Sequence, residues 1–306
     1  MIKHFLYVPW TGLGLYNGFR GNRWLRNRIK VFNQFILPSL QHQTNKNFTL
    51  WCSWRWEEKN NHLVKQFIAD MDKVREFKTV HTFNGVCFWD DKYSDIEARS
   101  RLLSSLHGSI GGLLDEIGEV ESVIMTIQPS DDLYSKVMVD VIQKGFQELP
   151  NIQAIGFTKG YVMNYRTKEL AEYNPNTTPP FFSIKFPRDV FTDPLKHAAY
   201  TGPYKSHEYI GDKLRFAPIN ERGFLVGTHG ENISTVFNHP FRGRMIEGDE
   251  KNQVLTQFNV LDVPPIKIRL SLRKWLLRKL PHKVQRKLRY IWGEKIWQNI
   301  YDFLRN

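Results

Sequence analysis

The chain begins by alternating short apolar runs with segments whose apolar residues recur at helical spacing. Residues 1–9 predict a β-strand, and apolar residues at every third or fourth position predict a helix over residues 25–40. A second strand is predicted at residues 48–54 and a long helix at residues 95–117. The continuous apolar run at residues 122–127 is typical of a strand buried on both faces.

After a further helix, predicted at residues 135–149, the pattern changes. Short strands are predicted at 152–157, 161–165 and 181–186, and residues 187–250 are expected to be rich in loops. Strands that alternate with helices favour an α/β fold with a mostly parallel sheet flanked by helices.

Ligands of such sheets bind beyond the carboxyl ends of the strands. The loops that follow the first strand and the strand at 122–127 are therefore the first places to look for chemistry. They cover residues 11–23 and 128–134.

Composition and charge divide the chain into two parts. Of its 306 residues, 41% are hydrophobic and 14% aromatic, which excludes a disordered chain and permits one large domain or two small ones. The formal net charge is +12, and residues 264–306 carry 12 Lys and Arg against 2 Asp and Glu. We therefore expect a nearly neutral body at 1–263 and a basic helical tail at 264–306.

The tail predicts two amphipathic helices separated by Pro281, with Trp and Leu beside Lys and Arg. This pattern favours a helix that lies on an anionic membrane surface. Alternatively, the apolar faces pack on the body and the charges are solvated. A third possibility, nucleic-acid binding by the tail, is disfavoured because the body is nearly neutral and no nucleic-acid motif is present.

The rest of the chain favours a cytoplasmic protein, peripheral on the inner face of the membrane. No stretch reaches the ~18 uninterrupted apolar residues of a membrane-spanning helix. Cys52 and Cys87 form no Cys-x-x-Cys pair, and free thiols suit a reducing cytoplasm.

The loop after the first strand contains Gly12, Gly14 and Gly18 and approximates a dinucleotide-binding fingerprint. The third glycine is one position late, however, and no acidic residue stands about 20 positions further on at the end of the second strand, so a Rossmann site is disfavoured. Either the loop is simply flexible, or its main chain contacts a phosphate or nucleotide.

Asp131 and Asp132 directly follow the buried strand predicted at 122–127. Adjacent carboxylates repel each other, a cost that a divalent cation can offset. The alternative is that they cap the helix that follows.

A polar cluster formed by His229, Glu231, Asn232 and Arg242 lies in a region expected to be loop. For such a cluster, binding a ligand and serving a structural role are about equally favoured interpretations. Glu208 follows His207 but lacks the second His of a zinc protease motif, so it is either a general base or an exposed ion-pairing residue.

Taken in order, the segments 24–48, 130–132 and 229–235 resemble the bacterial rhamnosyltransferase family of GT-A nucleotide-sugar glycosyltransferases. The resemblance extends over about residues 1–245. It implies a GT-A-like fold, a nucleotide-diphosphate sugar donor over the strand ends, and Mn²⁺ or Mg²⁺ on the acidic motif.

The acidic motif departs from the family pattern Arg-x-Asp-x-Asp-Asp. Ile127 stands in place of the Arg and Pro129 in place of the leading Asp, so only the last two carboxylates carry over. A protein with this motif could bind metal weakly, use another donor or be inactive.

For glycosyl transfer we expect the following roles. The donor is bound by Gly12, Arg23, Asp131, Asp132, His229, Asn232 and Arg242. The metal ligands are Asp131, Asp132 and His229, acting on the pyrophosphate. For an inverting reaction the general base is Glu208, with Glu231 as second choice.

The expected acceptor is a glycan or lipid-linked molecule of bacterial surface polysaccharide synthesis, as the resemblance implies. A non-catalytic protein that binds sugars or nucleotides, or a basic nucleic-acid-binding protein, remains the alternative. The sequence specifies neither the donor sugar nor the linkage.

Overall fold

The computed structural model describes residues 2–10, 21–85, 94–175, 181–201, 210–230, 232, 236–239 and 241–268. Gly12, Glu208, Glu231 and the tail beyond residue 268 lie outside the described residues, and so does Cys87. The roles assigned to them from the sequence therefore stay predictions.

Within the described residues, ten strands form one sheet. They are β1 (Ile2–Pro9), β2 (Thr49–Ser53), β3 (Lys78–Thr82), β4 (Ser122–Ile127), β5 (Leu133–Tyr134), β6 (Ala154–Asn164), β7 (Leu170–Tyr173), β8 (Phe182–Pro187), β9 (Phe216–Thr228) and β10 (Arg242–Ile246).

The helices of the first half are α1 (Gly21–Val31), a π-helix (Phe32–Ile36), α2 (Leu37–Gln41), a 3₁₀ helix (Trp56–Asn60), α3 (His62–Met71), α4 (Asp95–Gly111), α5 (Leu114–Ile117) and α6 (Met138–Glu148). Those of the second half are α7 (Arg188–Thr192), α8 (Pro194–Thr201), α9 (Ile210–Lys213) and α10 (Gly248–Gln257).

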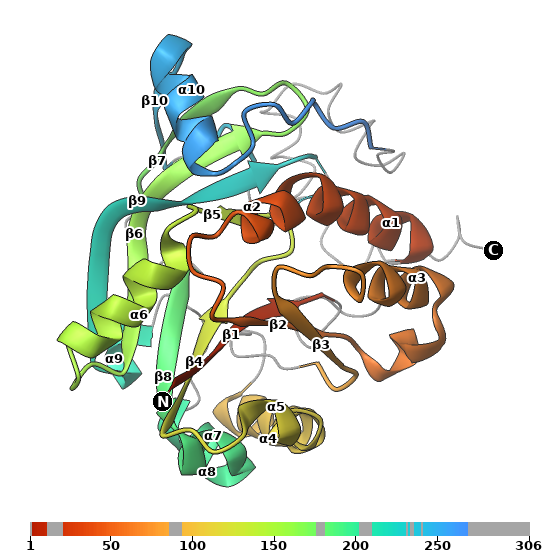
Figure 1. The fold of residues 1–306 in the computed structure, drawn as a ribbon, viewed down its shortest axis with the longest axis vertical. Coiled ribbons are helices and arrows are strands. Elements are labelled where there is room, and N and C mark those ends of the chain that lie inside the picture. Colours follow the sequence, from red (N-terminus) through yellow and green to blue (C-terminus); the bar gives the residue numbers. More distant parts are fainter. Residues whose placement is uncertain are drawn as a thin grey trace.

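The sheet is mixed, and its parallel part comes from the first half of the chain. The main strand order is β10-β7-β6-β8-β4-β1-β2-β3, and β1 pairs in parallel with both β2 and β4. β8 pairs antiparallel with β4 and β6, whereas β9 pairs in parallel with β6. The predicted α/β fold is confirmed, although the second half is largely antiparallel (Figure 1).

Helices cover both faces of the sheet. In Figure 1, α1 to α3 lie on one side of the β1–β3 strands, and α4, α5, α7 and α8 lie on the other. The side chains of β1 alternate accordingly: Leu6 and Val8 belong to the hydrophobic cluster under α1 and α3, and Phe5 and Tyr7 to the cluster under α4 and α8. This alternation places β1 between two apolar layers.

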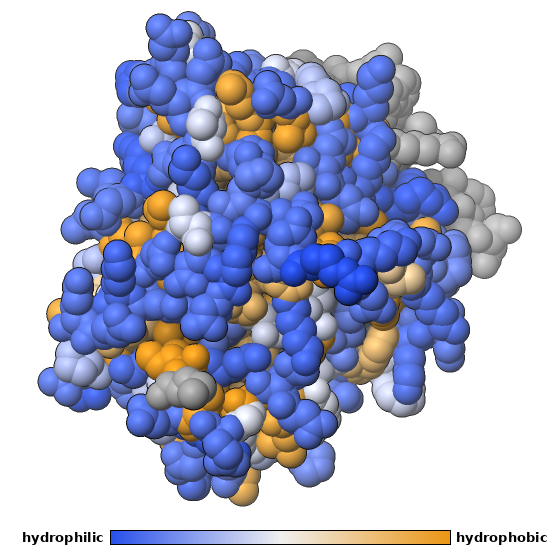
Figure 2. Space-filling view, in the orientation of Figure 1, coloured by the Kyte–Doolittle hydropathy of each residue, from blue (hydrophilic) through white to orange (hydrophobic). Residues whose placement is uncertain are grey.

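The largest side chains of this core are aromatic. The largest fully buried side chains are Trp51, Trp54, Tyr7, Tyr134, Tyr165, Phe5, Phe32, Phe35, Phe67, Phe146, Phe181 and Phe182. On the face shown in Figure 2, by contrast, hydrophilic side chains predominate and apolar ones form small separate areas. Among the described residues, aromatic side chains therefore fill much of the interior.

Several predicted elements have different bounds in the structure. The long helix ends at Gly111, and the short helix α5 follows it. The two strands predicted between residues 152 and 165 are one strand, β6, which pairs with three neighbours.

The prediction that residues 187–250 are rich in loops is wrong for the described residues of this region. This region contains β9, which has 13 residues, together with β10, three short helices and the start of α10. β9 was missed because its first half carries Pro218, Asn220 and Gly223, which normally indicate a turn. Its second half, from Phe224 to Thr228, is buried and leads into the polar cluster.

Candidate functional site

Two segments about a hundred residues apart meet beyond the end of β4. After Ile127 the chain reverses direction, and β5 then pairs antiparallel with β9, with Leu133 opposite Leu225. This pairing carries Asp131 and Asp132 to the end of β9. The alternative that these two residues cap the next helix is excluded, because α6 begins at Met138 and Val137 is its N-cap residue.

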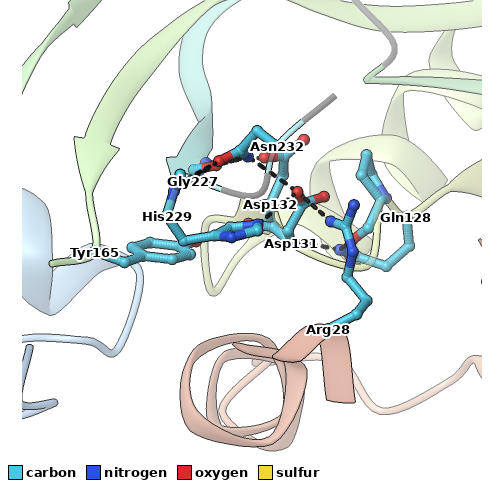
Figure 3. Close-up of polar contacts among 10 residues, drawn as sticks. Arg28, Gln128, Asp131, Asp132, Tyr165, Gly227, His229 and Asn232 are labelled. Atoms are coloured by element: carbon cyan, nitrogen blue, oxygen red, sulfur yellow. Dashed lines mark hydrogen bonds and ion pairs between the residues drawn. The ribbon is translucent and has the colours of Figure 1, made fainter. Parts of the chain in front are cut away.

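Three nitrogen donors meet Oδ2 of Asp131 (Figure 3). The Arg28 guanidinium of α1 forms an ion pair with it, and its side chain is only 5% exposed. His229 Nε2 donates to the same oxygen over 3.2 Å, and Asn232 Nδ2 donates over 3.1 Å. Because charged groups are rarely buried unless they are paired, the Arg28–Asp131 pair ties α1 to the strand ends.

Asn232 organises the turn after β9. Its Nδ2 also donates to the carbonyl of Gly227 over 2.6 Å. Its Oδ1 accepts from the main-chain N–H groups of His229, at 2.6 Å, and Gly230, at 3.2 Å. One amide side chain thus holds the turn and orients the His229 ring toward Asp131.

Asp132 is held by main-chain contacts. Its Oδ1 accepts from the Gly227 N–H over 2.8 Å, and its carbonyl accepts from Gln128 Nε2 over 2.9 Å. Gln128 is fully buried, and its Oε1 has no hydrogen-bond partner within the described part of the chain. Together these contacts fix the main chain between residues 128 and 132.

The two carboxyl groups differ in their electrostatics. Burial alone would raise the pKa of Asp131, but the charge of Arg28 and the hydrogen bond from His229 outweigh it and lower this pKa from 3.8 to about 2. Burial, together with the charge of Asp131, raises the pKa of Asp132 well above 3.8. Asp131 is therefore the anion of the pair, and Asp132 gains a proton far more readily.

Gly227 leaves room for this arrangement. A Cβ atom there would lie 2.2 Å from the carbonyl oxygen of Asp131 and 2.3 Å from the ring of Tyr165. Since real Cβ atoms do not approach so closely, only glycine permits β9 to contact the acidic segment directly.

Two adjacent carboxylates supply the oxygen ligands that Mg²⁺ and Mn²⁺ prefer. The contacts described above use Oδ2 of Asp131 and Oδ1 of Asp132, so the second oxygen of each carboxylate is the atom suited to Mg²⁺ or Mn²⁺. Among the described residues, no three His, Cys, Asp or Glu side chains are grouped to hold a metal by themselves. Coordination by His229 Nε2 would require its hydrogen bond to Asp131 to break.

Four of the residues selected from the sequence lie together: Asp131, Asp132, His229 and Asn232. Arg23 lies on α1, five residues before Arg28, and is partly exposed. Arg242 is exposed at the start of β10, where its Nη1 donates to Asn238 over 2.5 Å and its guanidinium lies 5.4 Å from the Phe237 ring.

Sequence reasoning missed Arg28, although a signal was present. Arg28 stands three residues after Leu25 and four before Phe32, which places it on the apolar face of the helix. An arginine on that face needs an acidic partner, and residues 21–41 contain none. Nothing comparable pointed to Gly227 or Tyr165, because their roles depend on contacts across the sheet.

Comparison with known proteins gives one family match. Residues 19–81 match the family model described as "Putative rhamnosyl transferase". The matched region contains α1 with Arg28, whereas Asp131 and His229 lie outside it. No curated protein sequence matches the chain.

Several solved structures share a low similarity with the chain. One is described as a "putative nucleotide-diphospho-sugar transferase" of Desulfovibrio desulfuricans G20. It is 12% identical to this chain with a TM-score of 0.35, and the match covers 74% of this chain and 80% of the other. Another is TarS of S. aureus, which is 13% identical with a TM-score of 0.34. The match covers 92% of this chain but only 50% of TarS. A third is mouse xyloside xylosyltransferase 1, which is 9% identical with a TM-score of 0.36. The match covers 72% of this chain and 85% of the other.

The family model names the family that the sequence resembles, and it covers the first of the three segments that carry the resemblance. This match supports a glycosyltransferase function. The resemblance to the rhamnosyltransferase family is therefore confirmed for residues 19–81.

Proposed function

We propose that this protein is a glycosyltransferase that uses a nucleotide-diphosphate sugar and binds it at the Arg28–Asp131–His229 cluster. The observation that carries this proposal is the buried Arg28–Asp131 ion pair beyond the end of β4, with Asp132 beside it. Burying such charges lowers stability unless they are paired, and clusters with widely separated pKa values favour a functional site.

The chain's own residues would orient and hold the donor. Asp131 keeps its charge because Arg28 faces it, and the Asn232 contacts fix the His229 ring. Mn²⁺ or Mg²⁺, when bound by Asp131 and Asp132, would act as a Lewis acid on the diphosphate. Its charge would also favour the ionised form of Asp132.

The finer assignments rest on the sequence and the family resemblance. We propose an inverting transfer with Glu208, or else Glu231, as the base that takes the proton of the acceptor hydroxyl. The acceptor would be a glycan or lipid-linked molecule of bacterial surface polysaccharide synthesis. Rhamnose is the sugar that the family description suggests.

The proposed function predicts turnover of one donor in a panel of nucleotide sugars. We expect release of the nucleoside diphosphate from that donor in the presence of Mn²⁺, and slower release after chelation by EDTA. Released nucleoside diphosphate should be measured by a coupled assay, with and without candidate acceptors. Full activity in EDTA would contradict the proposed role of the metal, but the proposed glycosyltransferase function would still stand.

The same panel separates the alternatives. A non-catalytic relative would bind a nucleotide sugar in isothermal titration calorimetry without consuming it. A chain that neither binds nor consumes any nucleotide sugar would contradict the proposed function outright.

We also propose that the basic tail brings the enzyme to an anionic membrane surface. Ten net positive charges, at about 1 kcal/mol for each Lys or Arg near such a surface, suffice for reversible binding. Within the described residues, no helix is both long and apolar enough to cross a bilayer. The last described residues, 264–268, lie against α1, where Lys30 Nζ donates to the carbonyl of Lys267 over 2.8 Å.

Vesicle flotation tests the membrane proposal. The full chain should float with phosphatidylcholine vesicles that contain phosphatidylglycerol. With vesicles of phosphatidylcholine alone it should remain at the bottom of the gradient. Replacing Arg273, Lys274 and Arg278 by Glu should abolish flotation, whereas replacing Lys59, Lys65 and Lys73 of the body should not. Tight oligonucleotide binding without flotation would instead favour the nucleic-acid alternative.

A further inference from the structure

Tyr165 connects four separate parts of the body. Its hydroxyl donates to the carbonyl of Asp131 over 3.0 Å, and its N–H donates to the carbonyl of Thr228 over 2.8 Å. Its ring stacks on Phe35 of the π-helix, with centroids 3.9 Å apart and planes 7° from parallel. Its own carbonyl accepts from the N–H of Ile266 over 2.8 Å.

The hydroxyl contact acts on the main chain of Asp131 rather than on its carboxylate. Tyr165 is fully buried, and its ring and the Asp131 carbonyl both occupy the space that a Cβ atom at residue 227 would need. A tilt of the Tyr165 ring would therefore shift the peptide that carries the Asp131 side chain. The carboxylate would move relative to Arg28 and His229, which belong to other elements.

Residues 260–268, here named the C-terminal strap, hold Tyr165 from the opposite side. Lys168 Nζ donates to two strap carbonyls, of Val260 over 2.8 Å and of Val263 over 2.7 Å. Gln34 Nε2 of the π-helix donates to the carbonyl of Pro264 over 2.8 Å. Ile266 is only 2% exposed, so the strap is packed into the body and its end leads into the basic tail.

We propose that Tyr165 is a positioning residue for Asp131 and that the C-terminal strap holds Tyr165 in place. The segment that leads into the basic tail thereby supports the donor site. This inference rests on the proposed function, because it concerns how the same site is kept in its working geometry. Sub-ångström placement of such groups is what efficient catalysis requires.

A pair of matched variants tests the role of the Tyr165 hydroxyl. Tyr165→Phe removes the hydrogen bond to Asp131. Tyr200→Phe, away from the site, removes a hydrogen bond of the same kind, from the Tyr200 hydroxyl to the carbonyl of Lys185 over 2.9 Å. Both should lower the melting temperature by similar amounts. Only Tyr165→Phe should lower kcat/KM for the donor, by about tenfold, with part of the loss in KM.

Equal kinetic losses in the two variants would overturn the proposal, because they would indicate a general loss of structure. Unchanged kinetics in Tyr165→Phe would overturn it as well. Either result requires an active wild-type enzyme, so it differs from a failure of the proposed function, in which the wild type itself consumes no nucleotide sugar.

Ile266→Pro tests the strap, because it removes the main-chain N–H that donates a hydrogen bond to the carbonyl of Tyr165. We expect kcat/KM to fall, and the loss to be smaller in the Tyr165→Phe background, since both changes act through one residue. Losses that multiply fully would contradict this linkage. If Ile266→Pro does not fold, Gln34→Leu combined with Lys168→Met loosens the same strap, because the two changes remove the side-chain hydrogen bonds to its carbonyls.

Hydrogen exchange supplies a readout that needs no activity. Loosening the strap should speed amide exchange in peptides that cover residues 128–132, far away in the sequence, but not in α3. Unchanged exchange at residues 128–132 would overturn the proposed support even if the enzyme's substrate were still unidentified.

Discussion

Replacing Asp131 by Asn is expected to lower kcat/KM for the donor about a hundredfold or more. The carboxylate is the anion on which Arg28, His229 and Asn232 converge, and the amide of Asn carries no charge to hold them or a cation. Losing one preorganised electrostatic contact at a reacting centre typically costs about 10²–10³ in rate. Steady-state kinetics with the donor found in the nucleotide-sugar panel measures the effect.

Asp70→Asn is the matched control for this change. Asp70 is an exposed carboxylate on α3 that pairs with Lys73, so its loss should leave donor kinetics unchanged. The assignment of Asp131 to the donor site is wrong if Asp131→Asn retains wild-type kcat/KM under the same conditions.

Replacing Arg28 by Ala is expected to lower the free energy of unfolding by about 3–5 kcal/mol, because it leaves the buried Asp131 charge without its cation. Urea denaturation monitored by tryptophan fluorescence measures this loss. Arg26→Ala, on the exposed face of the same helix, is the control and should change stability by less than about 0.5 kcal/mol.

The effect of Arg28→Ala should depend on pH with a definite sign. In the wild type the pKa of Asp131 is about 2, below its ordinary 3.8, so the stability it contributes is present above 3.8 and lost as pH falls through 2. Without Arg28, burial raises this pKa and the carboxyl becomes neutral at higher pH. The stability difference between the two proteins should therefore begin to shrink as pH falls through the raised pKa of the variant, above 3.8, and keep shrinking until about pH 2. An unchanging difference would contradict the ion-pair explanation.

A double variant separates stability from activity. Arg28→Met combined with Asp131→Leu replaces the ion pair by apolar groups, an exchange that often restores or increases stability. We expect such a protein to unfold at nearly the wild-type urea concentration and to remain inactive. Recovery of activity along with stability would mean that the pair serves only the fold.

The first half of the fold was predictable because its elements follow simple periodicities. β1, β2 and β4 are short apolar runs, and α6 places its apolar residues at helical spacing. Strands that are buried on both faces and joined through helices leave little choice of arrangement. The position of the Asp131–Asp132 pair beyond a strand end followed from that topology.

β3 and β9 were not predictable because their patterns are broken. β3 is only partly buried and carries Lys, Thr and His, so it does not stand out from the charged stretch around it. β9 contains turn-forming residues in its first half and is held by pairing with β6 over most of its length. In both cases neighbouring strands, rather than local propensity, decide the structure.

The site was predicted in part for a related reason. His229 and Asn232 were selectable as polar residues clustered beside glycine, but their contacts with Asp131 depend on how β5 pairs with β9. Arg28 was detectable from its position on an apolar helix face. Gly227 matters because two groups from other segments occupy the space that a Cβ atom would need there, which no local pattern reveals.

The pairing of β9 with β5 and β6 also sets the order in which the protein can be assembled during its synthesis. Arg28 and Asp131 leave the ribosome early, but Gly227 and Asn232 emerge much later, and the C-terminal strap follows them. Until then the acidic segment lacks half of its hydrogen-bond partners, and contacts of such large sequence separation form slowly. Nascent chains stalled before β9 should therefore be open to proteolysis around residues 128–134, and become resistant only once β9 and the strap have emerged.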